Sequence, residues 1–296
     1  MSGYELAAYE PAQRDDYLRL LRDAWGDAGL SGAEFDWWFS RNPEGSLMSV
    51  ARDDGSVIGV AAHSLYRMAL DGGRRPATFS VHATTTPAAR GRGVFVGLER
   101  KHEEEAKARG AAVVLAFASA PTAPLFLGPL GWTQVGKLRI WARPLPRVSL
   151  RRGRAEQIQR FEFDGDAASS WPNHIVRDAG YLNWRYLDSP RDYVAYRAGG
   201  GYAVLGHKRH RGHPIALVAD LVGPNVLPLL RACVAGVKPG TRALIALPGP
   251  REAAAYAACG FVPTPMSLDF MGKPLAGQLD PDPHAWRFTL GDTDFF

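Results

Sequence analysis

Cysteine is scarce in this sequence, with only Cys233 and Cys259 among 296 residues. Two cysteines cannot build a disulfide framework, and their spacing matches no metal-binding motif. The sequence also has no apolar run long enough to cross a bilayer. Its N-terminal stretch has no basic segment followed by an apolar core, so we expect no secretory signal. We therefore expect a reduced, cytoplasmic protein with no membrane partner.

Acidic residues are fewer than basic ones, which gives a formal net charge of +5 and an isoelectric point near 9.3. An excess of positive charge favours nucleic acid or phosphate-bearing cofactors as partners. Much of this excess lies in 143–154 and 207–213, and neither stretch has the interleaved aromatic residues that stack bases. We interpret the two stretches as a solvated linker and a charged hairpin tip, and we expect no nucleic-acid partner.

Three histidines in the second of these stretches recur at three-residue spacing, namely His207, His210 and His213. They straddle a predicted hairpin turn, and the lysine and arginines beside them would oppose a bound cation. We therefore expect no metal.

The chain contains two similar series of predicted elements. The first comprises a strand at 4–9, helices from Pro11 and from the Ser31–Glu34 capping box, strands at 47–52, 57–69 and 76–86, a helix at about 92–109, a buried strand at 112–118, a short helix at 121–129 and strands at 133–145. The second comprises strands at 193–197, 202–207 and 214–222, a helix at 225–236, a strand at 242–247 and a short helix at 250–259. A Pro- and Arg-rich linker at about 144–155 separates them.

Four residues support a duplication. Trp37 and Trp184 are 147 positions apart, and so are Pro43 and Pro190. We predict an α/β (α+β) fold of two similar domains, 1–146 and 147–296. Each would be a mixed, mostly antiparallel sheet flanked by helices.

The stretch TTTPAARGRGVFVG at 84–97 passes from a strand into a helix through a positively charged, glycine-containing turn. Pro87 ends the strand because it removes a hydrogen-bond donor. The start of a helix carries unpaired amides and a partial positive charge, and both attract phosphate. Within RGRG at 90–93, the glycines let the backbone approach a ligand and the arginines add charge. The spacing is neither a Walker loop nor a dinucleotide fingerprint, so we predict an anion-binding loop of another kind.

This loop resembles the coenzyme A loop of the GCN5-related N-acetyltransferases (GNAT), whose pattern is Arg/Gln-x-x-Gly-x-Gly/Ala after a strand that often ends in proline. Pro87, Arg90 and Gly93 match, whereas Phe95 stands where glycine or alanine is usual. The likeness covers about 1–145 well and the second half more weakly. It implies that an acyl-CoA, most commonly acetyl-CoA, lies where parallel strands at about 81–86 and 112–118 separate.

The resemblance also implies which residues hold the coenzyme. The implied residues are Ala83, Thr84, Thr85, Arg90, Gly91, Arg92, Gly93, Val94 and Phe95. The amides of 90–95 would hold the pyrophosphate, and the main chain of 83–85 would pair with the pantetheine and polarise the thioester carbonyl. Catalysis would then consist mostly of positioning an amine against that carbonyl.

In many relatives a tyrosine four residues before the closing Gly-aromatic pair protonates the departing thiolate. Leu127 occupies that place before Gly131, while Tyr256 matches before Gly260. The second half nevertheless has no phosphate loop after its strand at 216–222. Tyr256 is therefore either an acid or substrate contact, or a packed helix residue.

Four further residues are candidates for the site, each with a structural alternative. His82 lies on the strand before the loop and could serve as general base, or it could be structural. Ser119 could assist the thiolate, or it could cap the helix that follows. Asp220, within an apolar strand, could bind a substrate amine or pair with an internal arginine. Trp37 could line the acceptor pocket or belong to the core.

The function that we predict is acyl transfer from acetyl-CoA or another acyl-CoA to a primary amine of a small molecule, peptide or protein. The second half would be a degenerate GNAT-like domain that shapes the acceptor site. Another acyl group, a hydroxyl acceptor, and a catalytically silent module that senses acyl-CoA all stay open. The sequence predicts neither the acceptor nor the oligomeric state. We also expect the C-terminal segment from His284 onward to pack against the body of the protein.

Overall fold

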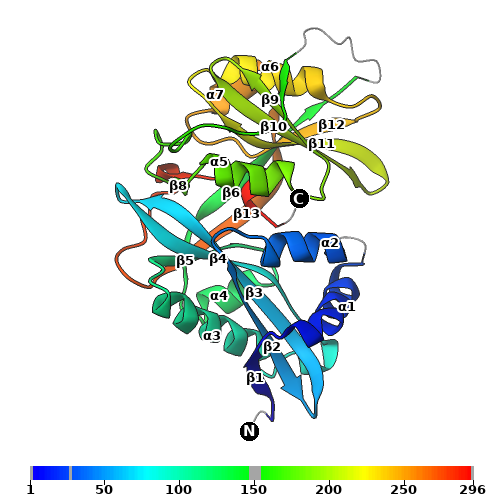
Figure 1. Cartoon of the computed structure of the whole chain (residues 1–296), viewed down its shortest axis with the longest axis vertical. Coiled ribbons are helices and arrows are strands. Elements are labelled where there is room, and N and C mark those ends of the chain that lie inside the picture. Colours follow the sequence, from blue (N-terminus) through cyan, green and yellow to red (C-terminus); the bar gives the residue numbers. More distant parts are fainter. Residues whose placement is uncertain (1–2, 27–28, 147–154, 295–296) are drawn as a thin grey trace. The chain divides into compact units, whose positions relative to one another are not determined.

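The computed structural model describes residues 3–26, 29–146 and 155–294. The chain forms two compact units (Figure 1). The first unit consists of Met1–Met68, Arg74–Gly136 and Asp269–Pro281, and the second of Ala69–Gly73, Lys137–Leu268 and Asp282–Phe296. None of the described helices is both long and apolar enough to span a membrane.

The first unit is built on a mixed sheet. Its strands, in spatial order, are β1 (Glu5–Ala8), β2 (Ser46–Asp53), β3 (Ser56–Leu70), β4 (Gly73–Thr85), β5 (Val113–Ala118) and the Asp269–Pro274 part of β13 (Val262–Pro274). Strands β1, β2 and β3 pair antiparallel, and β4 and β5 pair parallel. All six residues of β5 are buried, as the continuous apolar run predicts.

Four helices accompany this sheet. They are α1 (Arg14–Trp25), α2 (Gly32–Phe35), α3 (Val94–Ala108) and α4 (Ala123–Leu127). The predicted capping box is confirmed, because the Ser31 side chain accepts a hydrogen bond from the Glu34 amide. Ala106 of α3 and Phe126 of α4 pack against Leu47, Val114 and Met271 of the strands. This core fixes α3 and α4 on the sheet.

The second unit repeats much of this arrangement. Its strands, in spatial order, are β7 (Glu156–Ile158), β9 (Tyr193–Ala198), β10 (Gly201–His210), β11 (His213–Val222), β12 (Ala243–Ala246) and the Trp141–Pro144 part of β6 (Thr133–Pro144). Its helices are α5 (Ala179–Leu182), α6 (Val226–Gly236) and α7 (Ala253–Ala258). The predicted hairpin tip is confirmed, since His210 and His213 face each other across the β10–β11 turn. The predicted fold class, mostly antiparallel sheets flanked by helices, is thus confirmed.

Each unit completes its sheet with a strand from the other half of the sequence. In the first unit, Asp269–Pro274 pairs antiparallel with all of β5. In the second, Trp141–Pro144 pairs antiparallel with β12. The predicted division at 146/147 follows the order of the chain and does not show this exchange.

The repeat appears again in an unusual local structure. A π-helical segment, Asp36–Ser40, follows α2, and a second one, Asn183–Leu187, follows α5. Their first residues are 147 positions apart, the offset already seen for the tryptophans. Trp37 and Trp184 are buried in these two segments. Short π-helical segments are rare, so their recurrence at the same offset supports a duplication.

The C-terminal segment packs within the second unit, as expected. Its strand β14 (Trp286–Arg287) pairs parallel with β8 (Asn173–Ile175), and a 3-10 turn at Leu290–Asp292 follows. Most side chains from Trp286 to Thr293 are buried. Neither β8 nor β14 is predictable from the sequence, because strands of two or three residues leave no periodicity to detect.

Asp166 stabilises this part of the second unit. Its carboxylate lies 2.7 Å from His174 Nε2 and accepts hydrogen bonds of 2.9 Å from the backbone amides of Ala168 and Arg177. Burial alone would raise the pKa of Asp166, but these hydrogen bonds outweigh it and lower the pKa to about 2. The stabilisation is therefore present above the unfolded-state pKa of 3.8 and is lost as the pH falls through the folded-state value.

We expect Asp166→Asn to lower the free energy of unfolding by about 2 kcal/mol at neutral pH. Its deficit relative to the wild type should shrink between about pH 4 and pH 2, because the wild-type carboxyl becomes protonated there. Urea unfolding of both proteins across this pH range measures the difference. A deficit that does not change with pH would contradict the assignment.

Candidate functional site

Strands β4 and β5 separate shortly after they pair. Their parallel ladder joins Thr78 to Val114 and Phe79 to Leu115, and β4 then continues to Thr85 beside β3, without β5 on its other side. His82 has a positive φ of 50°, which is rare for a residue other than glycine and breaks the regular alternation of the strand. The backbone of Ala83–Thr85 thus lies beyond the last residue that β4 shares with β5.

The turn after β4 leads directly to the start of a helix. Gly91 and Gly93 have φ values of 76° and 79°, a region that favours glycine, and α3 begins at Val94. No side chain among the described residues caps this helix start. A Cβ at Gly91 would meet nothing within 4 Å, and one at Gly93 would meet only the Tyr4 hydroxyl, at 3.9 Å. The first amides of α3 are therefore accessible to a ligand.

The two arginines of the turn lie differently. Arg90 is exposed, whereas Arg92 forms an ion pair with Asp53 of β2, with 2.7 Å between the Arg92 Nη1 and Asp53 Oδ2 atoms. Asp53 therefore offsets part of the positive charge near the helix start. This ion pair could not be predicted from the sequence, because Asp53 and Arg92 are 39 positions apart.

Phe95 departs from the family pattern, and the structure shows where its ring goes. The ring packs edge-on against Phe126 of α4, with 5.5 Å between ring centroids. The preceding residue, Val94, packs instead against β3, where a Cβ at Gly59 would lie 2.7 Å from its side chain. The bulk of Phe95 is thus taken up by contact with α4.

The two predicted catalytic residues both lie in the first unit. His82 is buried, and its ring contacts Trp38 and Phe39 edge-on at centroid distances of 5.1 and 5.9 Å. The Ser119 hydroxyl lies 2.9 Å from the Thr122 hydroxyl, and its carbonyl accepts from the Ala123 amide at the start of α4. Ser119 therefore belongs to the turn that begins α4, although the N-cap of that helix is Thr122. Roles in proton transfer stay predictions for both residues.

The three predicted substrate-binding residues are all buried. Trp37 has no exposed surface and packs edge-on against Trp38. Asp220 Oδ2 lies 3.2 Å from Arg177 Nε, and Asp220 Oδ1 lies 3.7 Å from Arg287 Nη1. Tyr256 belongs to the core of the second unit, and burial raises the pKa of its hydroxyl well above 10. Each side chain is thus found in the structural setting that the sequence offered as its alternative, and substrate contacts stay predictions.

The second unit has the same strand divergence, but its C-terminal segment contacts the strand that continues. Strands β11 and β12 pair only through Ala216–Leu217, and β11 continues to Val222. The C-terminal segment lies against this continuation: Arg287 donates a hydrogen bond to the Leu221 carbonyl, and a Cβ at Gly291 would come within 2.6 Å of the Ala219 carbonyl oxygen. In the second unit the C-terminal segment therefore contacts the part of β11 that corresponds to the end of β4, Ala83–Thr85, in the first.

Comparison with known proteins agrees with this geometry. Residues 5–135 match the family model of the acetyltransferase (GNAT) domain. This part of the chain belongs to the GNAT family. No curated protein matches the chain.

Solved structures share the fold of the GNAT domain and of the rest of the chain. A GCN5-related N-acetyltransferase from Anabaena variabilis is 13% identical with a TM-score of 0.64, over 92% of this chain and 73% of that one. One from Kribbella flavida is 17% identical with a TM-score of 0.63, over 92% and 71%. Eis1 from Mycobacterium abscessus is 14% identical with a TM-score of 0.59, over 92% and 73%. At these identities the likeness establishes the fold alone.

Proposed function

We propose that this protein transfers an acyl group, most simply acetyl, from acyl-CoA to a primary amine. The observation that carries the proposal is the uncapped start of α3. It follows two left-handed glycines and lies next to a strand edge that has separated from its neighbour. The match of residues 5–135 to the GNAT domain model supports an acyl-CoA as the ligand of this loop.

The residues present fit the coenzyme in two places. The amides from Gly91 to Phe95, with the exposed Arg90, would hold the pyrophosphate, since a helix start carries unpaired donors and about half a positive charge. The edge of Ala83–Thr85 that faces away from β3, beyond the ladder with β5, would hydrogen-bond the pantetheine. The bound coenzyme would supply an activated thioester.

In the reaction the amine nitrogen attacks the thioester carbonyl, the new C–N bond forms and the C–S bond breaks. Backbone amides of β4 would stabilise the negative charge that develops on the carbonyl oxygen. His82 is our proposed base for the proton that leaves the amine, and Ser119 our proposed group for assisting the thiolate. His82 immediately precedes the coenzyme-binding backbone of β4, which supports this choice.

Two observations bear on the competing functions. Leu127, in the place where many relatives carry the tyrosine acid, is exposed at the end of α4. The absence of that acid favours a module that binds acyl-CoA without turnover. The retained loop at 87–93 favours the enzyme, and a different acyl donor or a hydroxyl acceptor is compatible with both observations.

The experiment is a thiol-release assay with acetyl-CoA over a panel of amines, run on the wild type and on His82→Ala. We expect the variant to lower kcat by about 100-fold or more, as the loss of a general base does, with acetyl-CoA affinity little changed. His210→Ala is the matched control, because His210 lies on the exposed β10–β11 turn.

The role of His82 would be contradicted if His82→Ala lowered kcat and acetyl-CoA affinity equally. It would also be contradicted if the variant lowered neither. Binding of acetyl-CoA without thiol release for any amine would instead favour the silent module.

A further inference from the structure

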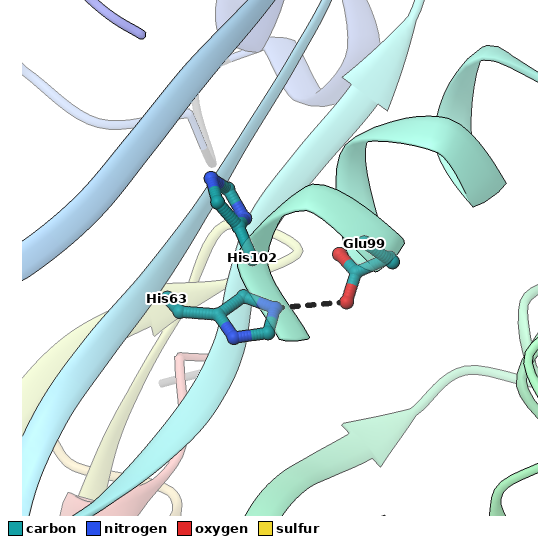
Figure 2. Close-up of side chains that lie close together, drawn as sticks. All are labelled: His63, Glu99 and His102. Carbon is teal, nitrogen blue, oxygen red and sulfur yellow. Dashed lines mark hydrogen bonds and ion pairs between the residues drawn. The ribbon is translucent and has the colours of Figure 1, made fainter. Parts of the chain in front are cut away.

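We propose that His63, Glu99 and His102 form a binding site for one divalent transition-metal ion, with zinc as the expected occupant. Glu99 and His102 lie three residues apart on the same face of α3, and His63 comes from β3 (Figure 2). This cluster is separate from the proposed coenzyme site, and the inference does not depend on the proposed function.

The donor atoms are already close together. One ligand atom from each residue lies within 4.8 Å of the other two, and all three residues are fully buried. His63 Nε2 and Glu99 Oε2 are 2.9 Å apart. Two ligands about 2.0–2.2 Å from a tetrahedral zinc ion lie roughly 3.3–3.6 Å from each other. The observed distance is that of a hydrogen bond, and a small outward shift of the two side chains would bring both atoms to ligand positions.

The outer atom of each residue is held by a hydroxyl group. His63 Nδ1 lies 3.2 Å from Thr78 Oγ1, and His102 Nε2 lies 2.9 Å from Ser49 Oγ. The Ser80 hydroxyl donates to Glu99 Oε1 at 3.0 Å. Metal-binding histidines and carboxylates are oriented by such outer hydrogen bonds. All three side chains thus present one fixed atom to a shared centre.

His102 provides the observation that a hydrogen-bonded cluster leaves unexplained. Its Nδ1 atom is buried and has no hydrogen-bond partner among the described residues. A buried polar atom without a partner is unfavourable, because it has given up its hydrogen bond to water. A metal ion bound to Nδ1, to His63 Nε2 and to Glu99 Oε2 would satisfy all three inner atoms together.

The donor set indicates the kind of ion. Two imidazole nitrogens and one carboxylate oxygen suit zinc and similar divalent transition metals, whereas calcium and magnesium prefer oxygen ligands alone. Because the three residues are fully buried, the ion would have a structural role and would link α3 to β3. This proposal departs from the expectation of no metal, which rested on the cysteines and on the histidines of 207–213.

The test measures the metal content of the full-length, untagged protein after incubation with Zn²⁺ and removal of loosely bound ion. We expect one zinc per chain in the wild type by plasma mass spectrometry, and a higher melting temperature for the metal-loaded protein than for the chelator-treated one. Co²⁺ in place of zinc should give the visible spectrum of a site with two nitrogen donors and one oxygen donor.

The variants locate the ion. His102→Leu should lose the bound zinc, and because it also removes the Nε2 partner of the buried Ser49 hydroxyl, circular dichroism checks that the variant folds. Ser49→Ala should weaken zinc binding by roughly 10–100-fold, since it frees the outer nitrogen of His102. His210→Gln/His213→Gln, which removes exposed histidines, should keep one zinc per chain.

Absence of bound zinc in the wild type would overturn the proposal. Full retention of zinc by His102→Leu, or its loss from the His210→Gln/His213→Gln control, would overturn it as well.

Discussion

Gly93→Asp should abolish measurable binding of CoA. The left-handed φ of 79° at Gly93 is unfavourable for an aspartate, and the new carboxylate would stand at the start of α3, where we place the pyrophosphate. Two unit charges about 4 Å apart near a protein surface repel by about 4 kcal/mol, so a loss of affinity of at least about 100-fold follows. Calorimetric titration with CoA measures it.

Gly72→Asp is the matched control for that experiment. Gly72 has a φ of 77°, and a Cβ there meets nothing within 4 Å, but it lies in the β3–β4 turn rather than in the loop. Both substitutions carry the same backbone strain and the same charge. Only the one at position 93 should affect CoA, and equal affinities for the two variants would contradict our placement of the pyrophosphate.

Arg177→Met should strongly destabilise the protein. Arg177 is fully buried, with its Nη2 atom 2.6 Å from Asp292 Oδ2 and its Nε atom 3.2 Å from Asp220 Oδ2. Burial alone would lower the pKa of Arg177, but Asp292 and Asp220 outweigh it and raise the pKa well above its usual value. Removal of the guanidinium takes a cation from the buried Asp292 and leaves Asp220 with Arg287, at 3.7 Å, and loss of one partner from such a buried network costs about 3–5 kcal/mol.

Urea unfolding measures this cost, with Arg14→Met as control. Arg14 forms a 2.9 Å ion pair with Asp36, but both side chains are more than a third exposed, so its loss should cost less than about 1 kcal/mol. Adding Asp292→Asn to Arg177→Met should recover part of the stability, because it removes the buried carboxylate that Arg177 no longer neutralises. If Arg177→Met and Arg14→Met lowered the free energy of unfolding by similar amounts, the ionic interactions of Arg177 with Asp220 and Asp292 would not stabilise the protein as we expect.

The local elements of this fold could be predicted from the sequence, but the strand partners could not. The helix from Val94 and the strand Val113–Ala118 follow from periodicity and burial pattern. The exchange of β13 and β6 between the two units leaves no such signal, since both strands follow a Gly-aromatic pair in the same way. Which sheet a strand joins is decided by contacts far apart in the sequence.

The same limit applies to the candidate site. The turn from Pro87 to Gly93 is local, and its residues alone predict its form. The partners of Asp220 were not predictable, because Arg177 and Arg287 lie 43 and 67 positions away. The cluster under α3 was missed for the same reason: the Glu99-x-x-His102 spacing is visible in the sequence, but its third member, His63, is 36 positions from Glu99.

Calorimetric titration of the wild-type chain with acetyl-CoA tests most directly whether the first unit, and not the second, binds the coenzyme. We predict a single binding site per chain, because the start of α3 is uncapped while the C-terminal segment covers the corresponding strand edge of the second unit. Two sites, or none, would contradict the account.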